Sequence, residues 1–585
     1  MSRNAEIAEL LEEFADRLEA LDVEFKPRAY RRAAENILDY PVAIEEVAAD
    51  GPDALDQIEG VGEAIAEKVI EYLEDGEIEE LEELRAELPA RMDELTAVEG
   101  VGPKTVGKLY EALGITSLDE LEAAATAEEI RTVSGFGPKT EENILANIPF
   151  AREAQQRELL GHARPVADDV LAYLDELSPV ERTSVAGSIR RWKPTIGDID
   201  IVIASEDPRA VIDRFTEWDS IETIIEAGSK KASVRARAVQ IDIRVVAPDQ
   251  FGSALQYFTG SRDHNVRARN RAIERGLKMN EYGVFDISDL EDADADSDTQ
   301  EGKRIAGESE TSMYEAIDLP WIPPEMREDT GEIDAAAAGT LPTVVDHDDI
   351  RGDLHVHSNW SDGNDSIETM VESATEQGYS YLAICDHASG PGIVASMGLD
   401  EDRISEQITV IEEVNEIAEM QVFSGVEANI DADGEIDISA DLLSSLDVVV
   451  ASPHSALDQD TDEATARLVA AVSHPDVSIL GHPTGRMLHS RTGLELRIDD
   501  VAAAAAAHDT ALEVNANPRR LDLDGMLVRA ALEHDVPIAI NTDAHSPVEY
   551  AHMRYGVHTA RRGWATAADV INTWSVEELS SFLNG

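Results

Sequence analysis

The sequence predicts a multidomain α+β and α/β chain, with a helical N-terminal region, a mixed α/β domain in the middle and a distorted β/α barrel at the C-terminal end. Three observations support this prediction. The 585 residues are too many for one hydrophobic core. Three Gly-x-Gly corners, each followed by a helical pattern, lie before residue 150. After about residue 350, apolar strands alternate with helical segments, which is typical of a parallel barrel.

The N-terminal region has the apolar spacing of amphipathic helices, beginning with Ile7, Leu10, Leu11, Phe14 and Leu18. Residues 1–84 contain the first glycine corner and residues 85–150 contain the other two. The glycine pairs are Gly60 and Gly62, Gly100 and Gly102, and Gly135 and Gly137. Helix N-terminal amides bind phosphate without reading base sequence, so each corner is a candidate DNA-backbone contact. An ordinary helix–turn–helix corner is the alternative.

The middle domain contains the most informative stretch, which runs from Gly187 to Asp200 and continues into an apolar strand. Asp198 and Asp200 project from one face of that strand, because side chains alternate along it. Asp242 is the single acid inside a second apolar strand, residues 239–246. If the two strands are neighbours, the three carboxylates form a cluster that holds two Mg²⁺ for in-line displacement at phosphorus.

The turn before the first strand offers groups that suit a triphosphate. Gly187 and Ser188 supply backbone N–H groups and a hydroxyl, and Arg191 supplies a guanidinium. The pattern therefore indicates nucleotidyl transfer. A surface turn with strand-end acids is the alternative in so acidic a chain.

These motifs, together with Tyr257-Phe258-Thr259-Gly260-Ser261, resemble the palm of the family X DNA polymerases. The resemblance implies that Asp198, Asp200 and Asp242 hold Mg²⁺ or Mn²⁺ and are catalytic. It implies a nucleotide pocket made of Gly187, Ser188, Arg191, Gly197, Tyr257, Phe258, Gly260 and Asn265, and DNA contacts by His264 and Arg267. Two positions depart from the family pattern: Ile196 replaces a phosphate-contacting Ser, and Gln240 replaces an Arg near the primer terminus.

The three glycine corners resemble helix-hairpin-helix DNA binders, and the first module resembles a 5′-deoxyribose-phosphate lyase domain. By matched position, Lys68 would be its Schiff-base nucleophile, and Lys26 and Tyr30 would lie near a 5′-phosphate. Ala64 replaces a phosphate-binding Lys of the family, so the lyase activity stays open.

The C-terminal region places possible metal ligands at the ends of apolar strands, where the sites of β/α barrels lie. The expected strands are residues 381–385, 448–451, 479–481, 512–515 and 538–541. The candidate ligands are His355, His357, Asp362, His387, Glu427, His454, His482, Asp543 and His545. Imidazole with carboxylate suits Zn²⁺, Mn²⁺ or Fe²⁺, and nine ligands exceed the needs of one ion.

This set resembles the ligands of the polymerase and histidinol phosphatase (PHP) domain, which is a distorted barrel with up to three metal ions. The resemblance implies metal-dependent phosphoester hydrolysis, with Zn²⁺ or Mn²⁺ as cofactors. Arg519 and Arg520 are candidates for holding the substrate phosphate, and a solvated pair is the alternative.

Composition adds two constraints. The chain has one cysteine, Cys385, and no N-terminal apolar segment, so we expect an intracellular, cytoplasmic protein without disulfides. Its formal charge of −72 is opposite to that of most DNA-binding proteins. The acids are spread along the chain, as in haloarchaeal proteins, and at molar salt the Debye length is about 3 Å, so their repulsion of DNA is screened.

Together, these features predict a family X repair polymerase of the bacterial and archaeal type that fills short DNA gaps with dNTPs. We expect a PHP domain with 3′→5′ exonuclease or abasic-site activity, and a monomer. The expected domains are 1–84 and 85–150 (helical), 151–262 (palm), 263–328 (thumb), 329–349 (linker) and 350–585 (PHP). The alternatives are a free-standing phosphatase with a DNA-binding appendage and an inactive DNA-end scaffold.

Overall fold

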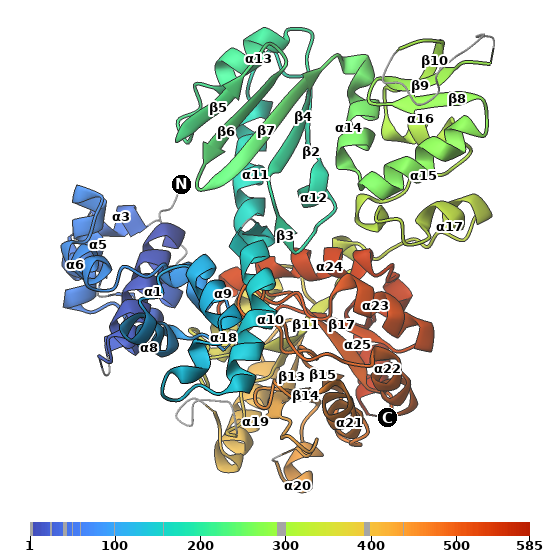
Figure 1. Ribbon diagram of the computed structural model, residues 1–585. Helices are drawn as coiled ribbons and strands as arrows, with labels where there is room; N and C mark the ends of the chain where they lie inside the picture. The colour runs from blue at the N-terminus through green and yellow to red at the C-terminus, as the bar shows by residue number, and fades with distance from the viewer. Residues whose placement is uncertain are drawn as a thin grey trace. The chain divides into compact units, whose positions relative to one another are not determined.

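The computed structural model divides the chain into two compact units (Figure 1). The first unit contains Met1–Gln156 and Met487–Thr492, and the second contains Arg157–Arg486 and Gly493–Gly585. The structure describes residues 4–23, 26–38, 44–49, 51–55, 57–58, 60–98, 100–155, 157–288, 300–390, 398–436 and 438–584. Within these ranges, no helix is both long enough and apolar enough to cross a membrane.

The N-terminal part of the first unit is helical, as predicted. Its helices are α1 (Asn4–Ala20), α2 (Lys26–Leu38), α3 (Ile44–Ala48), α4 (Pro52–Leu55), α5 (Glu63–Asp75), α6 (Glu79–Glu87), α7 (Met92–Thr96), α8 (Pro103–Leu113), α9 (Leu118–Thr126), η1 (Ile130–Thr132) and α10 (Pro138–Gln155). Ile7, Leu11, Phe14 and Leu18 are buried in one apolar cluster, and Leu10 packs at its edge. A second cluster runs from Leu88 to Ala151.

Each glycine corner turns the chain into a helix. The first glycine of each pair has a positive φ, which is 79° at Gly60, 83° at Gly100 and 95° at Gly135. Such angles strain residues that carry a Cβ, so glycine is required there. Helices α5, α8 and α10 begin directly after the second glycine of each pair.

The second unit begins with a five-stranded sheet in the order β2-β4-β7-β6-β5. Its strands are β2 (Arg182–Val185), β4 (Ile199–Ala204), β5 (Thr223–Ala227), β6 (Lys231–Ala236) and β7 (Val239–Val246). The elements around it are β1 (Glu158–Leu159), α11 (Leu160–Asp175), α12 (Gly187–Arg190), β3 (Thr195–Ile196), α13 (Pro208–Phe215), η2 (Pro248–Gln250) and α14 (Phe251–Thr259). Strands β4 and β7 are parallel neighbours, as the predicted cluster of three carboxylates requires.

The next segment packs a small antiparallel sheet, β10-β9-β8, against helices. Its elements are α15 (Arg262–Ile273), β8 (Leu277–Asn280), β9 (Gly283–Asp286), β10 (Lys303–Ala306), α16 (Glu310–Glu315), η3 (Pro324–Met326), α17 (Glu332–Ala338) and η4 (His347–Asp349). The stretch 329–349, expected as a linker, contains α17, and Ile333, Ala336 and Val344 pack into the apolar cluster of this segment. The expectation of a linker is therefore wrong for this part, because its alanines form a packed helix.

The C-terminal region is a seven-stranded parallel sheet whose spatial order, β11 to β17, is the order of the sequence. The strands are β11 (Gly352–Val356), β12 (Tyr381–Ile384), β13 (Gln421–Asn429), β14 (Val448–Ser452), β15 (Ile479–Leu480), β16 (Ala511–Asn515) and β17 (Ile538–Asn541). A bridge between Val356 and Ala544 joins the two edges, so the sheet is a nearly closed barrel. This confirms the predicted architecture, and each predicted strand lies within one residue of its observed bounds.

Helices surround the barrel strands (Figure 1). They are α18 (Ile367–Glu376), α19 (Glu401–Asn415), α20 (Ala440–Leu443), α21 (Thr461–Val472), α22 (Ile498–Ala507), α23 (Gly525–Ala531), η5 (Leu532–His534), η6 (Pro547–His552), α24 (Met553–Arg562), η7 (Ala567–Asp569), η8 (Ile571–Thr573) and α25 (Val576–Leu583). The strands are buried on both faces, which explains their nearly continuous apolar sequences.

A buried ion-pair cluster holds the palm sheet and the following segment together. Glu310 accepts two hydrogen bonds from Arg190, both at 2.7 Å, and one from Arg327 at 2.6 Å. Arg327 is fully buried and Glu310 is 7% exposed. Burial alone would raise the pKa of Glu310, but Arg327 and Arg190 hold it well below its usual range, so the carboxyl stays ionised.

Replacement of Glu310 by Ala leaves two guanidinium groups in the interior without their counter-ion. We expect Glu310→Ala to lower the free energy of unfolding by about 3–5 kcal/mol, measured by denaturant unfolding in high salt. Glu315→Ala, on the exposed face of the same helix, is the matched control and should leave stability nearly unchanged. Equal losses in the two variants would contradict a dominant role for this cluster.

Candidate metal centres

The first candidate centre is formed by Asp198, Asp200 and Asp242. Asp200 on β4 lies directly opposite Asp242 on β7, because the two parallel strands pair in that register. Asp198 precedes β4 by one residue and faces the same side. One oxygen from each carboxylate lies within 4.8 Å of the others, so the structure brings together all three predicted residues.

The electrostatics of this cluster favour a divalent cation. Burial, followed by repulsion from Asp198 and Asp242, raises the pKa of Asp200 to about 7. Burial and repulsion from Asp242 also raise the pKa of Asp198. Carboxylate oxygens are the ligands of Mg²⁺ and Mn²⁺, and such an ion would relieve the repulsion. The three carboxylates therefore fit the expected metal. The Gln240 side-chain amide donates hydrogen bonds to both carboxylate oxygens of Asp242, each at 3.2 Å.

The predicted phosphate turn lies against these carboxylates. Gly187 has a φ of 60°, and a Cβ built there would lie 2.1 Å from an Asp200 carboxylate oxygen. Only glycine allows this approach. Ser188 is half-buried in the same turn. A Cβ at Gly197 would have only the Arg157 guanidinium nearby, at 3.5 Å, so this glycine leaves space near Asp198.

The second predicted nucleotide motif lies beside Arg191. The Tyr257 and Phe258 rings are 5.1 Å apart at the end of α14. Asn265 donates to the Tyr257 carbonyl oxygen at 2.7 Å. Gly260 has a φ of 70°, and a Cβ there would lie 3.2 Å from an Arg191 nitrogen. The two motifs, far apart in sequence, thus meet at this guanidinium.

Some predicted contacts differ from the observed environment. His264, predicted as a DNA contact, is fully buried, and its ring is hydrogen-bonded to Glu332 at 2.6 Å and to Tyr314 at 2.8 Å. Arg267 pairs with Asp334 at 2.6 Å and Asp329 at 3.3 Å. Ile196 is fully buried in β3, so its apolar side chain is part of the core.

In the first unit, the predicted lyase residues gather around one carboxylate. The Lys68 ammonium pairs with Glu80, and Lys26 lies 4.0 Å from the same side chain. Tyr30, predicted near a 5′-phosphate, is 5% exposed and stacks on Phe14 with ring centroids 4.5 Å apart. The second glycines of the corners are open, because a Cβ at Gly62, Gly102 or Gly137 would meet nothing within 4 Å.

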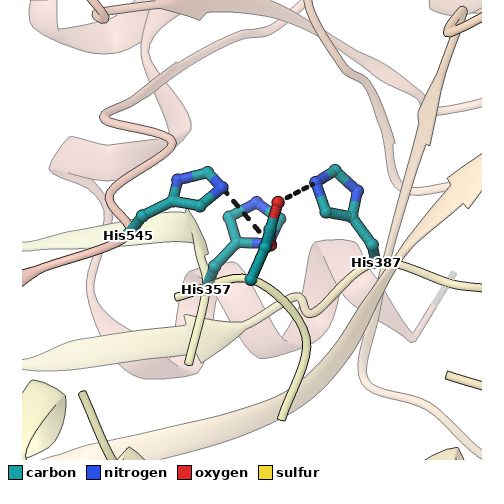
Figure 2. A group of neighbouring side chains, drawn as sticks. His357, His387 and His545 are labelled. Atoms are coloured by element: carbon teal, nitrogen blue, oxygen red, sulfur yellow. Dashed lines mark ion pairs between the residues drawn. The ribbon is translucent and has the colours of Figure 1, made fainter. Parts of the chain in front are cut away.

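The second candidate centre lies at the carboxyl ends of the barrel strands. Three overlapping groups each bring their ligand atoms within 4.8 Å. They are His357, Asp362, His387 and His545; His355, His357 and Asp543; and His387, Glu427 and His454. The ninth predicted residue, His482, lies 2.9 Å from Glu427. Figure 2 shows His357, His387 and His545 facing one another across a carboxylate.

Several buried atoms at this centre make no hydrogen bond to the described part of the chain, although they lie close to groups of opposite charge. They are His355 Nε2, both ring nitrogens of His357, His387 Nδ1 and Glu427 Oε2, and His387 Nδ1 lies 2.6 Å from Glu427 Oε2. Buried polar atoms that make no hydrogen bond are rare in folded proteins. A set of imidazoles and carboxylates suits Zn²⁺, Mn²⁺ or Fe²⁺, so these residues fit the group that the sequence implies.

The imidazoles also act as counter-ions for the acids. Burial alone would lower the pKa of His387, but Glu427 and Asp362 raise it to about 10. Burial opposes the shift of Asp362 as well, yet His545 and His387 hold its pKa below the usual range. Because metal ligation requires neutral imidazole, ions would bind here with release of protons.

Sequence reasoning missed the residues that orient these ligands. Glu513, fully buried on β16, accepts a hydrogen bond from His355 Nδ1 at 2.8 Å and one from the His482 backbone at 2.6 Å. Asp386 accepts hydrogen bonds from Ser358 and from Gln407. The signal for Glu513 was present, since it is a single acid inside an apolar strand, as Asp242 is.

The predicted phosphate-binding arginines occupy different environments. The Arg520 guanidinium lies 3.7 Å from Asp543, at the edge of the ligand cluster. Arg519 is exposed. Only Arg520 is therefore brought close to the centre.

Family models match four parts of the chain. The helix-hairpin-helix domain matches residues 2–78, and the SAM-like helix-hairpin-helix tandem matches 92–148. The DNA polymerase beta thumb matches 254–328, and the PHP domain matches 353–517.

Three relatives show how far these similarities extend. The DNA polymerase/3′-5′ exonuclease PolX of Bacillus subtilis is 34% identical over 583 residues, which cover 99% of each chain. DNA polymerase lambda of Rattus norvegicus is 25% identical over 302 residues, 48% of this chain and 49% of the relative. A probable phosphatase of Thermoanaerobacter is 25% identical over 233 residues, 38% of this chain and 90% of the relative.

Glu513 provides a test of the barrel centre that does not depend on activity. We expect Glu513→Gln to weaken Mn²⁺ binding about 10–100-fold, because a neutral amide orients and polarises His355 less than a carboxylate does. The measurement is titration calorimetry with Mn²⁺, with bound metal counted by elemental analysis. Glu533→Gln, an exposed change, is the control. Unchanged affinity in Glu513→Gln would show that His355 does not depend on this partner.

Proposed function

The chain belongs to the family X DNA polymerases that carry a C-terminal PHP domain, and we propose that its palm carboxylates extend a DNA primer while its barrel cluster shortens 3′ ends. It is a DNA polymerase with 3′→5′ exonuclease activity. The single observation that supports this assignment of residues is that both centres are complete: three palm carboxylates converge across paired strands, and nine ligands converge in the barrel.

In the polymerase reaction, Asp198, Asp200 and Asp242 would hold two Mg²⁺ or Mn²⁺. When bound, these ions supply activation of the primer hydroxyl and stabilisation of the leaving pyrophosphate. The turn at Gly187 brings backbone close to the carboxylates, where a triphosphate would lie. Tyr257 and Phe258 would pack against the incoming sugar, with Asn265 fixing the Tyr257 backbone.

In the nuclease reaction, the nine barrel residues would hold up to three ions, with Zn²⁺ and Mn²⁺ as the best chemical fit. When bound, these ions supply activation of water and neutralisation of charge at phosphorus. Glu513 orients His355, and Arg520 lies where it could receive the substrate phosphate. The 3′ end prepared in the barrel is the group that the palm extends, so the two activities suit the repair of short gaps. Incision at abasic sites would use the same barrel chemistry.

DNA binding must operate despite the formal charge of −72. We attribute the acidic surface to work in concentrated salt, where repulsion of DNA is screened beyond about 3 Å. The open glycine corners would bind the DNA backbone through helix N-terminal amides, which need no net positive charge nearby. Assays should therefore be made in molar KCl.

The two alternatives leave part of the molecule without a role. A phosphatase would explain the barrel, which is the part that the Thermoanaerobacter relative covers. It would not require three glycine corners or the palm cluster. An inactive scaffold would not need two complete ligand sets.

Separate inactivation of the centres tests the proposal. On a one-nucleotide-gapped duplex with Mn²⁺ in high KCl, we expect Asp198→Ala/Asp200→Ala to reduce extension at least about 1000-fold and to spare primer shortening. His355→Ala/His357→Ala should do the reverse. If neither activity appears in the wild type at any salt concentration, the phosphatase and scaffold alternatives gain support, and phosphate monoesters become the next substrates.

Lyase activity is a second candidate, and the specific observation in its favour is that Lys68 is 13% exposed and lies beside Phe14, with the ring centroid 5.2 Å away. A Schiff base requires a neutral amine, so the Lys68–Glu80 ion pair must open before attack. We propose that a 5′-deoxyribose phosphate would be the substrate.

Borohydride trapping tests the lyase proposal. Wild type should form a covalent adduct with 5′-deoxyribose-phosphate DNA, and Lys68→Ala should reduce trapping at least about tenfold. Lys108→Ala, a change of another helical lysine in the same unit, is the control. Equal trapping in wild type and Lys68→Ala would exclude Lys68 as the nucleophile.

A further inference from the structure

Helix α24 of the barrel contacts residues 191–193 of the palm, called the palm loop below, which follow the predicted phosphate turn. The last turn of α24 lies against residues 191–193, which follow α12. Arg562 donates a hydrogen bond to the Arg191 carbonyl oxygen at 2.6 Å. The Trp192 ring stacks on the His558 ring, with centroids 3.6 Å apart and planes 10° apart. The palm loop is thus fixed from the barrel side through both backbone and side chain.

The contact is largely buried, and His558 and Arg561 each have a hydrogen-bond partner in it. Trp192 is 9% exposed, and Arg164 of α11 covers its ring at 4.9 Å. The His558 ring is hydrogen-bonded to the Glu325 carboxylate at 2.6 Å, and Arg561 donates a hydrogen bond to the same carboxylate at 2.8 Å. Such a buried contact between α24 and residues 191–193 holds the palm loop in one conformation.

Glu328 connects Arg191 to the barrel directly. Its carboxylate accepts a hydrogen bond from Arg191 Nε at 3.0 Å and one from Arg562 at 3.2 Å, and Lys193 lies 3.7 Å away. Although burial alone would raise it, Arg191 and Arg562 lower the pKa of Glu328, so the group is ionised. The Glu328 carboxylate is therefore shared between Arg191, which is proposed to bind the triphosphate, and Arg562 of the barrel.

This sharing affects how easily the Arg191 guanidinium can leave Glu328 for a nucleotide; the guanidinium also donates a hydrogen bond to the Thr259 carbonyl oxygen. If the Arg191 side chain turned to a nucleotide, the largely buried Glu328 carboxylate would lose one of its cationic partners, and that loss would oppose nucleotide binding. Arg562 stays beside Glu328 and keeps the charge paired. It also holds the Arg191 backbone, so only the side chain has to move.

We propose that α24 of the PHP barrel positions the dNTP-binding arginine of the polymerase site, with Arg562 as the positioning residue and Trp192 stacked on His558 as its support. This inference rests on the proposed role of Arg191 in binding the triphosphate. It assigns to the barrel a contribution to nucleotide affinity that is separate from the nuclease centre.

The test is steady-state kinetics of the full-length protein at saturating gapped DNA, in high KCl with Mn²⁺. Arg562→Met should raise KM for dNTP about tenfold, with kcat within about twofold of wild type, because the chemistry at the carboxylates is untouched. Arg562→Lys should recover most of the affinity, since it restores a cation beside Glu328. Nuclease activity should stay unchanged, and Arg209→Met, an exposed change in the palm, is the control.

Two further variants keep each outcome interpretable. Glu328→Gln retains Arg562 and should lower KM for dNTP, because Arg191 is no longer held by a carboxylate. Arg191→Ala should raise KM. If Arg191→Ala leaves KM unchanged, the proposed role of Arg191 fails. If Arg191→Ala raises KM while Arg562→Met and Glu328→Gln do not change it in opposite directions, the role of α24 is overturned.

Discussion

Both centres depend on the pairing of adjacent parallel strands, which brings ionisable side chains close together. In the palm, the pairing of β4 with β7 sets Asp200 opposite Asp242. In the barrel, the ordered ladder from β11 to β17 delivers imidazoles and carboxylates from most strands to one end. A shift of one residue in either ladder would turn these side chains to the other face. Strand register is thus the constraint on which the metal chemistry rests, and the apolar residues between the ligands specify it.

This constraint explains why so much of the sites could be predicted. Ligands such as Asp198 and His355 lie in or next to apolar strands, and strand ends meet at one edge of a sheet. The environment of other residues depends on distant partners that no local pattern encodes. His264 lies in a polar helix, but its ring is fully buried and hydrogen-bonded to Glu332, from the stretch expected as a linker. Trp192 meets His558 only through tertiary packing.

The charge of the chain has different consequences at the surface and in the interior. Exposed acids are screened in concentrated salt, so their ion pairs add little to stability. The pairs of Glu310 with Arg190 and Arg327, and those of Glu328, are shielded from solvent and keep their strength. Changes in the number of exposed acids can therefore leave these interior contacts intact.

The path of the chain through α24 limits how this protein can be rearranged. Eight residues before α24, the chain passes His545 of the candidate metal centre, and it then runs through η6 and α24 to the contact with Arg191. A hybrid that joins the palm of one relative to the barrel of another would part Arg562 and His558 from Arg191 and Trp192, the residues they contact here. Such a hybrid keeps the contact only if both of its sides come from the same relative.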